Sequence, residues 1–277
     1  MNSSLFRMYN YTKCGKRKVG GRYVNKRNED CRKADIHRGI FITADGMGGR
    51  PEAKITSLTA TMLLYTDMVD TYNLIKKRKY IDDDILNIFK DTLQERNKYI
   101  NAWSKLSSAD GCGTTIDGVL IDMNKIYGVH VGDGTVYKIN TLEKNMKALT
   151  SNDKDKIYGA NELGDLERDI VYSRDVPNHI GLEKVKIDTY SEPMLPHDII
   201  LMVTDGFTKK VHPDEILDAL TKNSFDDGIN ILKEFCNKPQ KMKEVLKGLA
   251  QRNYNVATNI FYDDTTFIAI KLRDQND

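Results

Sequence analysis

The hydrophobic pattern of the chain predicts short buried strands joined by tight turns. Apolar and β-branched runs occupy residues 39–43, 114–122, 125–131, 135–139, 198–204 and 265–272. Turn-forming residues separate several of them, as at Met123-Asn124 and at Gly132-Asp133-Gly134, and such short connections favour antiparallel pairing. The pattern therefore predicts antiparallel sheet as the core of the chain.

Helical periodicity appears between and after these strands. Apolar residues spaced by three or four predict the buried face of a helix whose first turn contains Pro51, with Ile55, Leu58, Met62, Tyr65 and Val69 on that face. Further helices are predicted over 81–106, 213–222, 226–236 and 240–252.

Two stretches show little pattern. Residues 1–28 are polar and basic, and only Tyr23-Val24 indicates an edge strand. Residues 140–197 mix charged residues with Gly, Asn and Pro without a sustained period, which predicts an irregular segment containing a flap beside a site. The sequence shows no repeat and no linker, so residues 1–277 are predicted to form a single domain.

Composition indicates a soluble globular protein, since 40% of the 277 residues are hydrophobic and 30% are charged. The net charge of +2 gives no indication of nucleic acid. Residues 1–38, however, hold eleven Lys and Arg against three acidic residues, and this excess suits an anionic substrate such as a phosphoprotein, or RNA. The four cysteines form no CxxC pair, and no signal-peptide core or membrane-spanning run is seen. We therefore expect free thiols and a location in the cytoplasm, without membrane contact.

Candidate chemistry begins at Asp45, which directly follows a predicted strand and precedes three glycines in four positions. Glycine lets the backbone approach a ligand closely. An Asp so placed can hold a hard cation, and Gly46 can add its carbonyl oxygen. The stretch alone is equally compatible with an ordinary turn in which Asp45 caps the following helix.

The same feature recurs at three other predicted strand edges. The four residues are Asp45, Asp133, Asp205 and Asp263. Each alone could be a turn former. If the strands are neighbours, the carboxylates converge, and their repulsion raises their pKa values unless cations compensate. All-oxygen ligation selects Mg²⁺ or Mn²⁺ rather than Zn²⁺.

With these motifs, residues 20–272 resemble the metal-dependent Ser/Thr protein phosphatases of type 2C (the PPM family), in its bacterial-like branch. The six motifs occur in the family's order: Arg27-Asn28-Glu29-Asp30, Ala44-Asp45-Gly46-Met47-Gly48-Gly49, Gly113-Thr114-Thr115, His130-Val131-Gly132-Asp133, Val203-Thr204-Asp205-Gly206-Phe207-Thr208 and Asp263-Asp264-Thr265-Thr266. Six weak motifs in order make a specific signal. The resemblance implies an α+β fold, with two antiparallel β-sheets packed as a sandwich and helices on both outer faces.

The resemblance also implies ligands for two Mn²⁺ or Mg²⁺ ions. Asp45 would bridge them. Asp205 and Asp263 would complete the coordination of one ion, and Glu29 with the Gly46 carbonyl would coordinate the other.

Two further roles are implied. Asp133 with Asp205 would form a weaker third metal site, and Asp30 would hydrogen-bond a metal-bound water. With Asp45, Asp205 and Asp263, Asp30 completes the predicted catalytic set. The implied reaction is hydrolysis of phosphoserine and phosphothreonine in proteins by a metal-bridging hydroxide. We expect the protein to be a monomer.

The chain departs from the family where phosphate is bound. The family's phosphate-binding Arg corresponds to Asn25, and Met47 stands where the eukaryotic branch has His. If this segment is extended, residues 25, 27 and 29 share one face. Arg27 is therefore predicted to bind the substrate phosphate, and Lys26 to point away.

Two alternatives come from other functional classes. The first is a catalytically inactive phosphatase fold that acts as a binding or regulatory module. Inactive relatives tend to lose the carboxylates, which are all present here. The second is an RNA-binding protein, for which the basic N-terminal stretch offers few interleaved aromatic residues.

Overall fold

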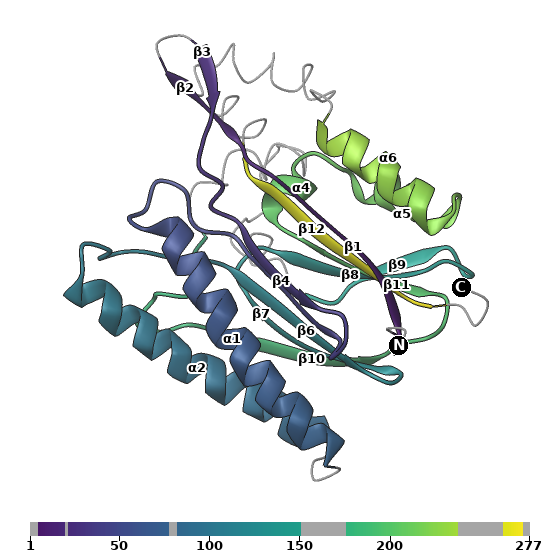
Figure 1. Ribbon diagram of the computed structural model, residues 1–277, viewed down its shortest axis with the longest axis horizontal. Helices are drawn as coiled ribbons and strands as arrows, with labels where there is room; N and C mark the ends of the chain where they lie inside the picture. Colours follow the sequence, from purple (N-terminus) through teal and green to yellow (C-terminus); the bar gives the residue numbers. More distant parts are fainter. Residues whose placement is uncertain (1–4, 20–21, 78–81, 151–175, 238–262, 274–277) are drawn as a thin grey trace, which may run out of the picture.

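A computed structural model describes residues 5–19, 22–77, 82–150, 176–237 and 263–273. Two five-stranded antiparallel sheets pack face to face (Figure 1). In order across the first sheet lie β1 (Phe6–Lys13), β12 (Thr265–Leu272), β11 (Asp198–Val203), β8 (Thr135–Asn140) and β9 (Asn145–Ala148). In order across the second lie β10 (Asp188–Pro193), β7 (Lys125–Val131), β6 (Ile116–Asp122), β5 (Ile40–Ala44) and β4 (Cys31–Asp35).

Helices cover the outer faces of both sheets. Helices α1 (Ala53–Lys76) and α2 (Asp82–Leu106) lie on the second sheet, whereas α4 (Asp205–Thr208), α5 (Pro213–Thr221) and α6 (Phe225–Asn237) lie on the first (Figure 1). The predicted fold class, a sandwich with helices on both outer faces, is confirmed. None of the described helices has the length and apolar character needed to cross a membrane.

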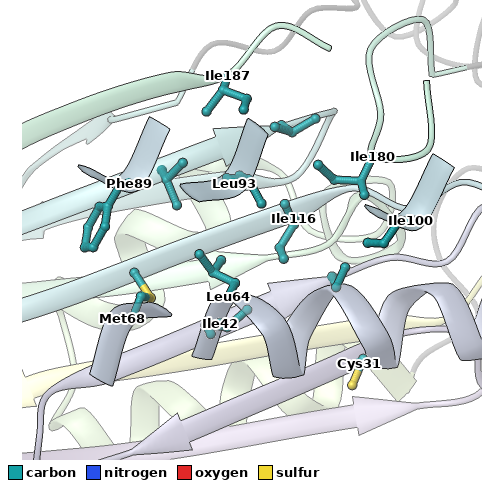
Figure 2. Close-up of a cluster of buried hydrophobic side chains, with 14 of the residues drawn as sticks. Cys31, Ile42, Leu64, Met68, Phe89, Leu93, Ile100, Ile116, Ile180 and Ile187 are labelled. Carbon is teal, nitrogen blue, oxygen red and sulfur yellow. The ribbon is translucent and has the colours of Figure 1, made fainter. Parts of the chain in front are cut away.

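The buried side chains form three layers. Alternation along β5 sends Ile40 and Ile42 toward the helices and Phe41 toward the other sheet. Figure 2 shows the cluster between the second sheet and its helices, where Leu64 and Met68 of α1 meet Phe89 of α2. The sandwich therefore has a continuous, closely packed core, and the connecting loops extend from its ends.

The predicted buried face of α1 is wrong in its first half. Ile55, Leu58 and Met62 are 39%, 47% and 44% exposed. The buried positions there are small or polar: Ala53, Thr56, Ser57, Ala60 and Thr61. Small residues let the helix approach the segment that carries Glu29 closely, and Ser57 Oγ donates a hydrogen bond to the Glu29 carbonyl at 2.6 Å. The helix starts at Ala53, so Pro51 precedes it.

The remaining strand predictions are largely confirmed. The runs after residue 110 correspond to β6, β7, β8, β11 and β12, and Tyr23-Val24 lies in β3 (Arg22–Asn25), which pairs with β2 (Lys16–Val19). The sequence missed β1, β2, β4, β9 and β10. The last two fall within the segment predicted to be irregular. The predicted helix 240–252, and residues 151–175 of that segment, lie outside the described residues.

Candidate metal centre

The register of the strands brings the predicted acidic residues to one end of the sandwich. Ala44 at the end of β5 pairs with Cys31 at the start of β4. In the other sheet, Val203 at the end of β11 pairs with Thr135 at the start of β8 and with Phe267 near the start of β12. The adjoining loops carry Glu29, Asp30, Asp45, Asp133 and Asp263, and Asp205 is the first residue of α4, which follows β11. Antiparallel pairing therefore gathers the strand-edge acidic residues at one end of the sandwich, as the sequence pattern predicted.

The backbone of Asp45 is fixed by the neighbouring motif. Thr114 Oγ1 and the Thr115 amide both donate to the Asp45 carbonyl, at 2.7 and 2.9 Å. The Asp45 amide donates to Thr115 Oγ1 at 3.0 Å. Gly113-Thr114-Thr115 therefore holds the turn from which the Asp45 carboxylate projects.

Gly46 joins this turn to the segment that carries Glu29. Its amide donates to the Glu29 carbonyl at 3.2 Å. A Cβ at this position would lie 2.5 Å from the Ala53 carbonyl oxygen and 2.8 Å from that of Glu29. Only glycine allows this approach, which places the Glu29 and Asp45 backbones side by side.

Asp30 is buried between the two sheets. Its Oδ2 accepts a hydrogen bond from Thr204 Oγ1 at 3.0 Å. Its Oδ1 is buried and has no hydrogen-bond partner among the described residues. Burial raises the pKa of Asp30 to about 7, and the charges of Asp264 and Asp263 add to that effect.

The electrostatics of Asp45 show that the carboxylates converge. Its pKa lies well above the usual range, first because of burial and then because of Asp30, Asp205, Asp263 and Asp133, in that order. Charges shift the pKa of a neighbouring carboxylate chiefly at short range and in a poorly solvated site. The structure thus brings all four strand-edge aspartates together, with Asp30.

Two lysines that the sequence analysis missed enter the cluster. Lys209 Nζ lies 2.6 Å from Asp205 Oδ2 and 2.7 Å from Asp263 Oδ2. Burial disfavours its charge, but these carboxylates raise its pKa well above the usual value. Lys209 follows Asp205 by four residues, a spacing that could have predicted an ion pair on a helical turn.

The second lysine is Lys26, whose Nζ lies 3.2 Å from Glu29 Oε2, 3.2 Å from Asp264 Oδ2 and 3.6 Å from Asp263 Oδ1. The argument that placed Arg27 on the metal side is therefore wrong in its geometry. Strand β3 ends at Asn25, so alternation does not continue to Glu29. Arg27 is exposed, while its role in binding phosphate stays a prediction.

Asp264 has a structural place beside the site. Its side chain is fully buried, and its two oxygens accept backbone hydrogen bonds from Gly15 at 2.6 Å and Glu29 at 2.7 Å. Asp263 is 25% exposed and faces both lysines. Of the two neighbours, Asp263 is thus the one available to a ligand.

The chemistry of the donors suits a divalent cation. In their present arrangement, no three Asp, Glu, His or Cys side chains of the described ranges converge closely enough to hold one ion. The ammonium groups of Lys26 and Lys209 lie between the carboxylates. The convergent donors are all oxygens, their mutual repulsion calls for positive charge, and Asp30 Oδ1 is buried with an unfilled hydrogen-bonding capacity.

Comparison with known proteins points to one family. The family model described as "Protein phosphatase 2C" matches residues 21–249. The serine/threonine phosphatase stp of Listeria monocytogenes serotype 4b is 26% identical over 212 residues, which cover 73% of this chain and 75% of that protein. Protein phosphatase PhpP of Streptococcus pneumoniae serotype 2 is 24% identical over 221 residues, covering 78% and 87%.

Solved structures share the fold. Serine/threonine phosphatase Stp1 from Staphylococcus aureus superposes with a TM-score of 0.71 at 17% identity, covering 97% of this chain and 96% of that one. The catalytic domain of the phosphatase PstP, solved in complex with two manganese ions, gives a TM-score of 0.63 at 19% identity, with coverage of 97% and 99%.

Proposed function

The chain belongs to the protein phosphatase 2C family, and from this premise we propose that it hydrolyses phosphoserine and phosphothreonine in proteins with the help of bound Mn²⁺ or Mg²⁺. Of the named relatives, stp is a serine/threonine phosphatase and PhpP is a protein phosphatase. The observation that carries the proposal is the convergence of Asp30, Asp133, Asp205 and Asp263 on Asp45. The side-chain donors of this cluster are all carboxylate oxygens, the ligand type that Mg²⁺ and Mn²⁺ prefer.

We assign the ligands as the family pattern suggests. Asp45 would be shared between two ions, with Asp205 and Asp263 on one side, and Glu29 with the Gly46 carbonyl on the other. Asp133 would join Asp205 at a weaker third site. Bound there, the ions would lower the pKa of a water so that it attacks phosphorus at neutral pH, and would offset the charge on the phosphoryl oxygens.

The protein's own groups orient the reaction. Asp30 is held by Thr204, and its buried Oδ1 can accept a hydrogen bond from the attacking water. The backbone of Asp45 is held in place, because its amide and carbonyl are both bonded to the Thr114-Thr115 motif. This pre-organisation is what transition-state stabilisation requires.

The substrate class follows from the family, and the basic N-terminal stretch supports it. An excess of eight positive charges over residues 1–38 suits an anionic phosphoprotein better than a neutral partner. The retained carboxylates argue against an inactive binding module. The cytoplasmic location, the monomeric state and a role in signalling remain predictions.

One experiment tests the proposal. Phosphate release from a phosphothreonine peptide should require Mn²⁺ or Mg²⁺ and stop in excess chelator, with the Asp205→Asn variant as the inactive control. Full activity in chelator would overturn the metal-dependent mechanism. Phosphopeptide binding without phosphate release, at saturating metal, would support the inactive module.

A further inference from the structure

Lys209 occupies the position between two of the proposed metal ligands. Its ammonium bridges Asp205 Oδ2 at 2.6 Å and Asp263 Oδ2 at 2.7 Å. The backbone amide of Lys209 donates to the Asp205 carbonyl at 2.9 Å, so the lysine is fixed one helical turn beyond that aspartate. At 13% exposure its side chain is screened far less by water than a surface ion pair is.

An ammonium at this place neutralises the charge that would attract a metal ion. Two carboxylates carry two negative charges, and Lys209 removes one of them. A divalent cation on the same oxygens would stand beside the ammonium, and like charges at such separations repel strongly. Metal and ammonium are therefore alternatives, and the flexible four-carbon stem of lysine allows the exchange.

The other half of the site is held differently. Lys26 lies 3.2 Å from Glu29 and 3.6 Å from Asp263, and its side chain is more exposed, at 22%. Its contacts are longer and spread over more partners than those of Lys209. The ammonium of Lys209 therefore opposes metal binding at Asp205 and Asp263 more strongly than the ammonium of Lys26 does at Glu29.

We propose that Lys209 is a built-in counter-ion of Asp205 and Asp263 that a metal ion must displace, so that the two ions sharing Asp45 bind with unequal affinities and the ion on the Asp205–Asp263 half binds more weakly. This inference rests on the proposed metal-dependent function. In the metal-free protein, Lys209 holds the start of α4, with Asp205, close to the loop that carries Asp263.

The test is a manganese titration of the chelator-stripped full-length protein by calorimetry, with free Mn²⁺ followed by electron paramagnetic resonance. The wild type should show two classes of site. Lys209→Met and the polar, neutral Lys209→Gln should tighten the weaker class by about ten-fold or more, equivalent to ~1.4 kcal/mol. In chelator both variants should unfold at a lower temperature than the wild type, and Mn²⁺ should raise their melting temperature by more.

Lys210→Gln is the matched control. Lys210 is the adjacent lysine, and its ammonium contacts a backbone carbonyl and a hydroxyl, those of Asp263 and Thr265. Its loss removes the same charge from the chain but should leave the isotherm unchanged. Lys209 variants that bind Mn²⁺ as the wild type does, or a wild type with equal sites, would overturn the inference alone. Absence of Mn²⁺ binding in every protein would overturn the proposed function as well.

Discussion

Thr204 and Asp30 join the two sheets of the sandwich through a buried hydrogen bond. Thr204 lies at the end of β11 in one sheet, and Asp30 immediately precedes β4 in the other. The Thr204 hydroxyl donates to Asp30 Oδ2 at 3.0 Å and accepts from the Thr266 amide at 3.0 Å. Together with the hydrogen bond from the Glu29 amide to Asp264, this hydroxyl therefore links the two groups of carboxylates.

Thr204→Val should destabilise the protein. Valine keeps the shape of threonine but leaves Asp30 Oδ2 and the Thr266 amide without this partner in a buried place. The expected loss is about 1–3 kcal/mol in the free energy of unfolding, as for other unsatisfied buried groups. Urea unfolding followed by circular dichroism measures it.

Thr43→Val is the matched control, because Thr43 Oγ1 is equally buried yet has no hydrogen-bond partner within the described part of the chain. Removing that hydroxyl should leave stability unchanged or raise it. Equal losses in the two variants would show that the bond to Asp30 is not the cause.

Asp263→Asn and Asp264→Asn should separate activity from stability. Asp263 is partly exposed and faces the site, so its change should cut turnover by orders of magnitude and lower the melting temperature less than Asp264→Asn does. Asp264 accepts the Gly15 and Glu29 amides with its two oxygens, and Asn has only one oxygen to offer. Asp264→Asn should cost about 1.5–3 kcal/mol of stability. Severe loss of turnover from Asp264→Asn, with a normal melting temperature, would assign the ligand to Asp264 instead.

The sequence could locate these acids but could not distinguish their roles. Asp45, Asp133, Asp205 and Asp263 are each marked by a strand edge, which is a local signal. The clamp made by Asp264 joins residues almost 250 positions apart in the chain, and no local pattern reports such a pairing.

The four cysteines should differ sharply in reactivity. All four are free thiols; Cys31, Cys112 and Cys236 are buried and Cys14 is half-buried. Burial raises the pKa of Cys236 to about 12, so its reactive thiolate is scarce at pH 8. A disulfide reagent should label one thiol in the native protein and four after unfolding, and Cys14→Ser should abolish the native labelling. Rapid labelling of Cys236 in the native protein would contradict its buried position.

The fold was predictable where a segment's own pattern decides its structure. The boundaries of β7 and β12 match the predicted runs because both strands are strongly β-branched and buried. Strand β1 was missed because it lies at an edge, with polar residues along it, and gains its pairing from β12 at the far end of the chain. The buried face of α1 was misassigned because close helix–sheet packing selected small residues over large apolar ones.

The choice between Lys26 and Arg27 decides how the substrate phosphate is gripped. Strand alternation favoured Arg27, but β3 ends at Asn25 and Lys26 faces Glu29 and Asp263. Once metal ions neutralise those carboxylates, the Lys26 ammonium is the nearer positive charge for a phosphate dianion. We expect Lys26→Ala to raise KM for a phosphopeptide by about ten-fold at saturating Mn²⁺, the loss of one charged hydrogen bond.

Arg27→Ala is the control, since it removes an equal charge from the next, exposed position, and it should change KM much less. Lys26→Arg should retain most of the affinity, because the charge stays in place. Inhibition by inorganic phosphate should weaken in Lys26→Ala in step with KM at saturating Mn²⁺, where a change in metal affinity has no effect, so the weakening reports a lost phosphate contact. A larger effect from Arg27→Ala would mean that the extended geometry expected from the sequence continues past Asn25 when substrate is bound.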